Sequence, residues 1–170
     1  MSIDQPTAID SSLTFQVEDY RDIESELIAI YPEHYDELAV NKHRKKLKPG
    51  YKRYRVMASH GVIHLPTARN EAGELVGYWI FFVMQNLHYM DIKTAYNDIL
   101  YLRKPYRKGH NGLRFARFML DSLKAIGVDE VYCATKLHQD YGPIFERLGF
   151  APIERIYTKL LDGSTNEGQV

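Results

Sequence analysis

The sequence comprises 170 residues, of which 45% are hydrophobic and 26% are charged, values typical of a soluble globular protein and unlike those of a disordered or fibrous chain. Its 22 Lys and Arg residues balance 22 Asp and Glu residues, so no overall charge favours a nucleic acid or an anionic membrane as the partner. The length suits one domain with its own hydrophobic core.

The sequence also indicates a compartment. Its first residues lack the basic region and apolar stretch of a signal peptide, and the longest apolar run, 78–84, is too short to cross a bilayer. Cys133 is the only cysteine, which fits a reducing environment, and its apolar surroundings predict a small core residue rather than a nucleophile. We therefore expect a cytoplasmic protein with no membrane partner.

The first part of the chain is expected to be helical. Residues 1–12 and 162–170 are polar and predict flexible ends around a single domain at 13–161. From Asp19 the apolar residues follow helical spacing until Pro32, which predicts two short helices joined by a kink, the second at about 35–40. The basic stretch that follows contains Lys-Pro-Gly and predicts an exposed loop over 41–55.

The rest of the chain alternates between strand and helix patterns. A polar turn at 70–74 separates the first two strands as in a hairpin, and Gly127 ends a helix with a broad apolar face. The expected strands cover 62–67, 75–87, 95–102, 128–135 and 155–161, and the expected helices cover 112–126 and 141–148.

This order predicts an α+β (α/β) domain with a mixed, mostly antiparallel central sheet flanked by helices. The strand at 95–102, the helix at 112–126 and the strand at 128–135 form one βαβ crossover, because parallel neighbours need such a connection.

The turn between that strand and helix is the most informative segment. It is basic and contains Gly109 and Gly112, and it leads directly into an amphipathic helix. The first amides of a helix have no intrahelical partner and the helix dipole is positive there, so a phosphate group finds both donors and favourable potential. The segment predicts a phosphate-binding turn.

In this segment the chain resembles the GNAT superfamily of N-acetyltransferases, whose acyl-CoA motif reads Arg/Gln-x-x-Gly-x-Gly/Ala. Arg107 and Gly112 match the ends of the motif, whereas its middle glycine falls on His110 and this chain has Gly109 one place earlier. A second match lies at 140–150, which looks like the family's short helix ending in Tyr-Glu-Lys-x-Gly-Phe. The resemblance covers roughly 75–161, and small uncharacterised phage and prophage GNAT proteins show a closer likeness.

The resemblance implies a fold, a co-substrate and a reaction. A GNAT-like domain would bind acetyl-CoA as acyl donor and transfer its acetyl group to a primary amine by direct attack, without a covalent enzyme intermediate or a metal. The strand at 98–102 would splay from the strand at 128–135, with the thioester carbonyl held by an amide near Leu102. The expected cofactor-binding residues are Tyr101, Leu102, Arg107, Lys108, Gly109, His110, Asn111 and Gly112.

Two residues are candidates for proton transfer. In many family members a tyrosine of the short C-terminal helix is the acid, but Phe145 stands at that position, so the candidate is Tyr141, one helical turn earlier. Asp98 begins the strand leading to the cofactor turn and is the candidate base. The alternatives are an aromatic side chain packed on the sheet for Tyr141 and a strand-start carboxylate for Asp98.

Other polar residues give weaker signals. His88 and Tyr89 follow the central apolar strand and are candidates for the acceptor pocket, the alternative for the histidine being a hydrogen-bonded surface residue. Glu154, Tyr157 and Lys159 alternate on the last expected strand and predict a solvated face. The histidines have no spacing that would suggest zinc, so we expect no metal.

A run of basic residues at 42–55, interleaved with Tyr51 and Tyr54, supports a different class of function. Clustered cations contact phosphates and tyrosines stack on bases. The alternative is thus a non-catalytic GNAT-fold module that binds nucleic acid or a host protein through this segment, although charge runs are more often solvated loops. Exposed strand edges of such a fold also favour a homodimer.

Overall fold

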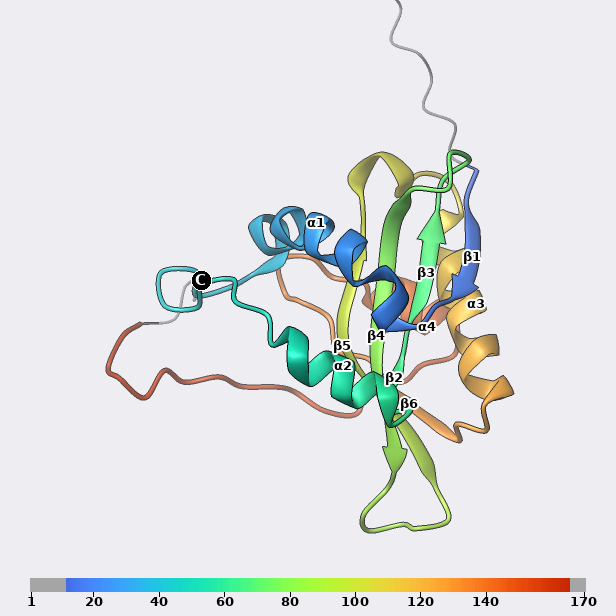
Figure 1. The fold of residues 1–170 in the computed structure, drawn as a ribbon. Helices are drawn as coiled ribbons and strands as arrows, with labels where there is room; N and C mark the ends of the chain where they lie inside the picture. Colours follow the sequence, from blue (N-terminus) through green and yellow to red (C-terminus); the bar gives the residue numbers. More distant parts are fainter. Residues whose placement is uncertain (1–11, 166–170) are drawn as a thin grey trace, which may run out of the picture.

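A computed structural model of the protein describes residues 12–165 and is built around one mixed sheet (Figure 1). The strands lie in the order β1-β3-β4-β5-β6, with β2 also paired to β4, and only β5 and β6 run parallel. The strands are β1 (Thr14–Val17), β2 (Ile63–His64), β3 (Pro66–Arg69), β4 (Leu75–Gln85), β5 (Lys93–Leu102) and β6 (Glu130–Tyr132).

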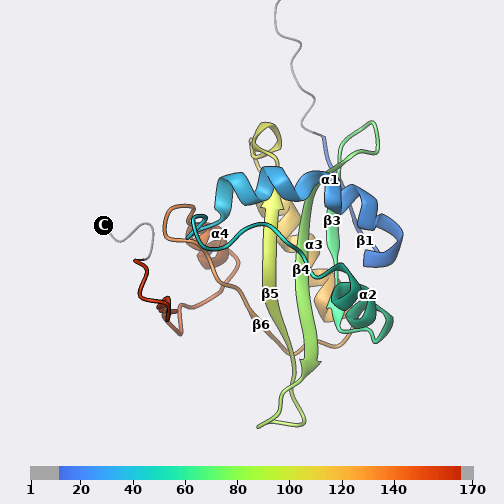
Figure 2. The ribbon, with the colours of Figure 1, turned by 60° about the vertical axis from the view of Figure 1, so that its left-hand side comes forward.

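Helices cover both faces of this sheet (Figure 2). Helices α1 (Tyr20–Leu38) and α2 (Tyr51–Ser59) lie on one face, and α3 (Asn111–Ala125) and α4 (Gly142–Arg147) lie on the other. A short 3-10 turn, η1 (Lys104–Tyr106), follows β5. The predicted fold class is confirmed, including the βαβ crossover β5-α3-β6.

Strand β4 is the centre of the core because both of its faces are buried. Trp79 and Phe81 point to the α3 side, whereas Tyr78 and Ile80 point to the α1 side, and all four are at most 1% exposed. A strand covered on both faces reads as a continuous apolar run rather than an alternating one. The apolar run at 78–84, too short to cross a bilayer, is therefore the doubly covered part of β4.

The prediction of two short helices is wrong, since α1 is a single helix that contains Pro32. The proline removes one hydrogen bond to the carbonyl of Ile28, but Ile28 and Pro32 both lie on the exposed side of the helix. Water can therefore solvate that carbonyl, and burial of the opposite face holds the helix together. The apolar spacing of Tyr20, Ile23 and Leu27 predicted that buried face correctly.

Two elements escaped the sequence patterns. Strand β1 pairs antiparallel with β3 although it is only four residues long. Helix α2 occupies the second part of the basic stretch expected to form a loop, and none of its residues is fully buried. It is held by Tyr51, Tyr54 and Ala58, which pack on the α1 side of the core.

The last predicted strand is wrong, because residues 155–161 pair with no strand in the described part of the chain. The segment leaves α4 as extended chain, and its Ile156 and Leu161 are 81% and 92% exposed. Glu154, Tyr157 and Lys159 are all exposed, as expected for a solvated face. The flexible ends predicted at 1–12 and 162–170 lie largely outside the described residues.

Arg69 joins β3 to the start of α1, and its loss should destabilise the fold. Its guanidinium donates to Glu18 at 2.9 and 3.1 Å and to Glu26 at 2.8 Å, and the side chain is only 13% exposed. Removing one partner of a buried ion pair leaves uncompensated charge, so Arg69→Ala should lower the free energy of unfolding by about 3 kcal/mol. Denaturant unfolding monitored by tryptophan fluorescence would measure the change.

Arg55 provides a matched control, because it also binds a glutamate of α1. Its contact with Glu24 at 2.6 Å is more exposed on the arginine side, where the side chain is 48% exposed against 13% for Arg69. Exposed pairs contribute about 0–1 kcal/mol, so Arg55→Ala should change stability by less than about 1 kcal/mol. Equal effects of the two substitutions would contradict the structural role given to Arg69.

Candidate functional site

A gap opens between β5 and β6 at one end of the sheet. The two strands pair only from Thr94 to Tyr96, and beyond this point the Asn97 amide oxygen accepts a hydrogen bond from the backbone N–H of Ala134. From residue 97 onward β5 therefore pairs with β4 alone among the strands of residues 12–165.

The amides of β5 that face this gap can be assigned from the sheet pattern. The N–H of Arg103 donates to the carbonyl of Val76 at 2.8 Å and so faces β4. Successive amides of a strand point to opposite edges, which directs the N–H groups of Leu100 and Leu102 into the gap. Two backbone donors thus line the splay that the sequence predicted near Leu102.

A β-bulge at Asp98 marks the beginning of the splayed part. Ile80 is opposite Ile99 and Phe81 is opposite Asn97, so Asp98 is an extra residue on β5. Bulges strengthen the local twist and redirect side chains. Here Asp98 and Ile99 both reach the α1 side of the sheet, where Asp98 accepts a hydrogen bond from Tyr54 and Ile99 packs in the core.

The turn between η1 and α3 presents a group of unpaired amides. Within the described chain, 12–165, the backbone N–H groups of five residues in this turn donate to no protein acceptor; they belong to Lys108, Gly109, His110, Gly112 and Leu113. Gly109 has φ +58° and open space where a side chain would lie. Such a turn at the positive end of a helix of 15 residues binds anions, and it fits a pyrophosphate.

The Arg107 side chain does not extend into this turn. Its guanidinium binds both carboxylate oxygens of Glu37 in α1, its Nε donates to the carbonyl of Leu102, and it lies 5.5 Å from the Tyr101 ring centroid. Arg107 thereby connects α1 to the end of β5. Its backbone still belongs to the turn, but this guanidinium is committed to a carboxylate.

A cavity of about 260 Å³ lies between the turn, β5 and α4, and we call it the α3-side cavity. Its wall includes the buried Trp79, whose indole N–H has no acceptor among residues 12–165. A Cβ on Gly112 would approach Ile144 to 3.4 Å, so the glycine keeps this wall open. Its other lining residues include Leu100, Leu102, Arg107, Gly109, His110, Tyr141 and Phe145.

Several solved structures with a similar fold are acetyltransferases. An aminoglycoside acetyltransferase from an uncultured soil metagenomic sample has a TM-score of 0.66 and 16% identity, covering 89% of this chain and 99% of its own. Glucosamine-6-phosphate N-acetyltransferase from Arabidopsis thaliana has a TM-score of 0.65 and 15% identity, covering 88% and 99%. A predicted acetyltransferase with acetyl-CoA from Clostridium acetobutylicum has a TM-score of 0.64 and 10% identity, covering 91% and 100%.

The chain has the GNAT fold. At these identities the likeness concerns the fold alone. No protein-family model and no curated protein sequence matches the chain.

Within the GNAT fold, the two aromatic residues of α4 lie together on the α3-side cavity. Phe145 is 6% exposed and packs on Trp79 and Phe150, which makes it a core residue. Tyr141 is half-buried at the start of α4, and burial raises the pKa of its phenol. The structure therefore brings the predicted acid candidate to the cavity, next to the splayed part of β5.

The α1 side of the gap carries two pairs of polar side chains that the sequence did not single out together. The Tyr54 hydroxyl donates to Asp98 at 2.8 Å, and burial raises the pKa of the Asp98 carboxyl although this hydrogen bond opposes the change. His34 Nδ1 lies 2.6 Å from the Tyr78 hydroxyl, and burial lowers the pKa of His34 to about 4. The signal that was missed is the spacing: His34 lies three residues, about one helical turn, after the buried Tyr31 and so shares its side of α1.

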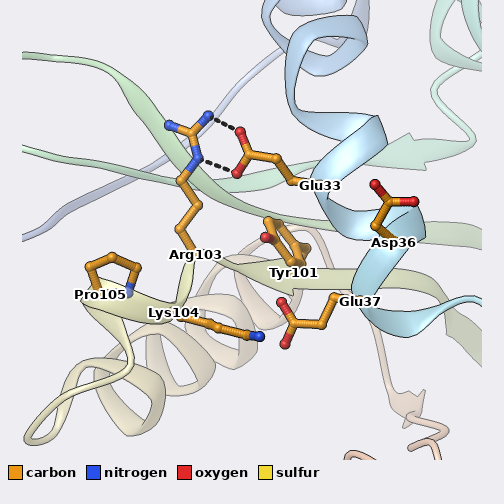
Figure 3. A pocket seen from close by; sticks show the side chains of 7 residues that line it. All are labelled: Glu33, Asp36, Glu37, Tyr101, Arg103, Lys104 and Pro105. Atoms are coloured by element: carbon orange, nitrogen blue, oxygen red, sulfur yellow. Dashed lines mark hydrogen bonds and ion pairs between the residues drawn. The ribbon is translucent and has the colours of Figure 1, made fainter.

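A second cavity, of about 440 Å³, opens on this side where α1 crosses the end of β5, and we call it the α1-side cavity (Figure 3). Glu33 binds Arg103 at 2.7 Å, and Glu37 and Lys104 face one another near the Tyr101 ring. Tyr101 is 3% exposed, so its side chain forms the floor of this cavity rather than a wall of the α3-side cavity.

His88 and Tyr89 are not brought to either cavity. They lie in the exposed hairpin at 86–92, at the opposite end of β4 and β5 from Leu102. The ten residues of β5 span roughly 30 Å, so the hairpin side chains are too far away to contact Leu102 at the end of the splayed part. The prediction that these two residues line the acceptor pocket is therefore not supported by their position.

The other groups that the sequence raised are possible metal ligands, Cys133 and the basic segment 42–55. In the described chain no group of His, Cys, Asp and Glu residues could hold a metal ion, and no described helix has the length and apolarity to cross a membrane. Burial raises the pKa of Cys133 to about 12, which disfavours a reactive thiolate. In the basic segment, Arg44 binds Asp162 and Arg55 binds Glu24, so part of its charge is neutralised.

Proposed function

We propose that the protein is an acyl-CoA-dependent N-acetyltransferase that moves the acetyl group of acetyl-CoA to a primary amine. The observation that carries this proposal is the juxtaposition of five unpaired amides at the α3 N-terminus with two amides of β5 that face a gap in the sheet. The first group suits a pyrophosphate, and the second suits the amide and thioester carbonyls of a chain lying along β5.

In this arrangement the donor would lie in the α3-side cavity. The turn at 108–113 would hold its pyrophosphate, and the Leu100 or Leu102 amide would stabilise the negative charge that develops on the thioester oxygen. The amine would approach from the α1 side of the sheet and attack directly. Tyr141 would supply the proton that the departing sulfur requires, and Asp98 remains the candidate base that the sequence suggested.

The cellular compartment and one competing function complete the proposal. We propose that the protein works in the cytoplasm, of a host cell if the chain is phage-encoded, where acetyl-CoA is available. A binding module that uses the basic segment 42–55 would instead show salt-dependent affinity for nucleic acid and no affinity for acetyl-CoA.

Calorimetric titration with acetyl-CoA tests the donor site. We expect micromolar affinity for acetyl-CoA and for CoA, because the pyrophosphate is common to both. Thiol release would then be followed with three amines suggested by the structural neighbours: sisomicin, glucosamine 6-phosphate and a peptide with N-terminal alanine. The absence of acetyl-CoA binding would count decisively against the proposal.

Replacing Tyr141 by phenylalanine should lower kcat by about 100-fold, the range for loss of one general acid, without a comparable change in acetyl-CoA affinity. The aromatic ring and its packing remain, so stability should change little. Phe150→Tyr offers a control, since it adds a hydroxyl next to α4 without removing one. If Tyr141→Phe kept wild-type kcat, the tyrosine would be an aromatic packing residue only.

A further inference from the structure

His34 is a polar group in the middle of an aromatic layer between α1 and the sheet. Its ring stacks on that of Tyr101, with centroids 5.1 Å apart and 11° between the planes, and its Nδ1 lies 2.6 Å from the Tyr78 hydroxyl. Both tyrosines are almost fully buried, at 0% and 3% exposed. The imidazole is therefore held in one orientation by a stack and a hydrogen bond.

The second ring nitrogen of His34 is in a different situation. Nε2 has no hydrogen-bond partner among residues 12–165. The fully buried polar atoms without a partner in this range do not include Nε2, so this nitrogen retains contact with solvent. The neutral ring has two tautomers: with the proton on Nδ1, that N–H donates to the Tyr78 oxygen and Nε2 carries a free lone pair, whereas with the proton on Nε2 the Tyr78 hydroxyl donates to Nδ1. Only the first tautomer makes Nε2 an oriented, accessible proton acceptor.

The position of His34 along β5 matches that of the amides in the gap. Tyr101 lies between Leu100 and Leu102, and a strand rises only about 3.3 Å per residue. The charge of Lys136, in the chain that follows β6, also acts on His34. His34 thus lies on the α1 face of the β4–β5 pair, level with the residues of β5 whose amides face the gap.

We propose that His34, in the tautomer with its proton on Nδ1, is the proton acceptor of the transfer in place of Asp98, with Nε2 taking the proton from the amine nitrogen once that nitrogen has bonded to the thioester carbon. The inference rests on the proposed function.

The step is balanced in atoms and charge. The neutral amine donates its lone pair to the carbonyl carbon, and the oxygen takes the π electrons as a negative charge. Nε2 then removes a proton from the positively charged nitrogen. The carbonyl re-forms, the C–S bond breaks, and sulfur leaves with its electron pair and takes a proton from Tyr141. His34 returns its proton to solvent and Tyr141 regains one, so the products are an amide and CoA.

The groups around His34 are consistent with this timing. Glu37 raises its proton affinity, whereas Arg107 and Lys136 lower it, and burial dominates and lowers the pKa. Tyr78 and Tyr101 complete its surroundings from β4 and β5. Such a ring stays neutral through the physiological range, so the lone pair of one ring nitrogen is available to a proton donor.

The test compares His34→Asn, His34→Ala and the control His64→Gln in thiol-release assays with the amines named above and with hydroxylamine. Asparagine places a hydrogen-bonding group where Nδ1 met Tyr78 but has no Nε2. His64 is also buried and binds Ser122 at 2.8 Å, on β2 and away from the gap, so its loss reports stability alone. We expect kcat to fall about 100-fold in both His34 variants and to stay unchanged in His64→Gln.

Added imidazole should restore activity to His34→Ala and leave Asp98→Asn unaffected. Nitrogen-15 NMR of the wild-type protein at pH 7 tests the assignment without an amine substrate. It should show His34 with an unprotonated Nε2. A proton on Nε2, or wild-type kcat in His34→Asn with acetyl-CoA affinity intact, would overturn the assignment. Failure of the wild type to bind acetyl-CoA would instead remove the proposed function itself.

Discussion

Gly112→Asp should lose acetyl-CoA affinity by at least about 100-fold while the protein stays folded, because a like charge placed against a phosphate costs several kcal/mol. The new carboxylate would lie at the second residue of α3, beside amides with no protein partner. A negative charge at a helix N-terminus is itself stabilising, so the substitution should raise helix stability as it blocks the anion site. Opposite effects on stability and binding would identify the turn as the donor site.

Two variants separate charge from crowding in this experiment. Gly112→Ala adds only the Cβ, which would lie 3.4 Å from Ile144, and it should weaken binding far less than aspartate does. Ala125→Asp makes the same change in charge at the other end of α3 and should leave affinity unchanged. Calorimetry of the three variants with acetyl-CoA gives the comparison. Equal affinity of Gly112→Asp and wild type would place the pyrophosphate elsewhere.

Stability should fall steeply between pH 6.5 and pH 4 because two histidines are buried in the neutral form. Burial lowers the pKa of both His34 and His64 from 6.5 to about 4. In this window the unfolded chain binds protons that the folded chain does not, so the contribution is complete above pH 6.5 and is lost as the pH falls to 4. Each histidine accounts for about 3 kcal/mol of this loss.

Differences between variants isolate the two histidines from the carboxylates that also titrate. His64→Gln keeps a nitrogen near Ser122, and His34→Asn keeps a polar group near Tyr78, so both should be less stable than wild type at pH 7 but lose less stability on acidification. Urea unfolding at pH 7 and pH 5 measures the slopes. If His64→Gln lost as much stability as wild type between pH 7 and pH 5, the pKa of His64 in the folded protein would be close to its value in the unfolded chain.

The sequence predicted the elements whose burial is periodic and missed those held by other means. The apolar spacing in α1 and α3 and the continuous run in β4 report which faces are covered, and those elements were predicted. Helix α2 has charges around much of its surface and is held by a few tyrosine contacts, which leave no period to detect. The pattern at 155–161 has strand propensity, but propensity does not supply a neighbouring strand.

The candidate site was predicted where it depends on backbone and missed where it depends on tertiary contacts. The turn at 108–113 follows from a strand, a glycine-containing turn and a helix in succession, and the splay of β5 was implied by the resemblance to the GNAT superfamily. The partnership of Arg107 with Glu37 joins residues 70 positions apart and leaves no local signal. The same holds for His34 and Tyr78, 44 positions apart, whose meeting depends on how α1 crosses the sheet.

The bulge at Asp98 has a consequence for how this sheet tolerates change in length. Side chains alternate across a strand, and a bulge absorbs one extra residue without changing the pairing on either side of it. Deleting Asp98 would make Asn97 and Ile99 neighbours on opposite faces, still opposite Phe81 and Ile80, so Tyr101 would keep facing α1. The extra residue is therefore not needed for the alternation of β5: it adds one carboxylate to the α1 face where the splay begins, and its deletion should remove that carboxylate while leaving the core pairing intact.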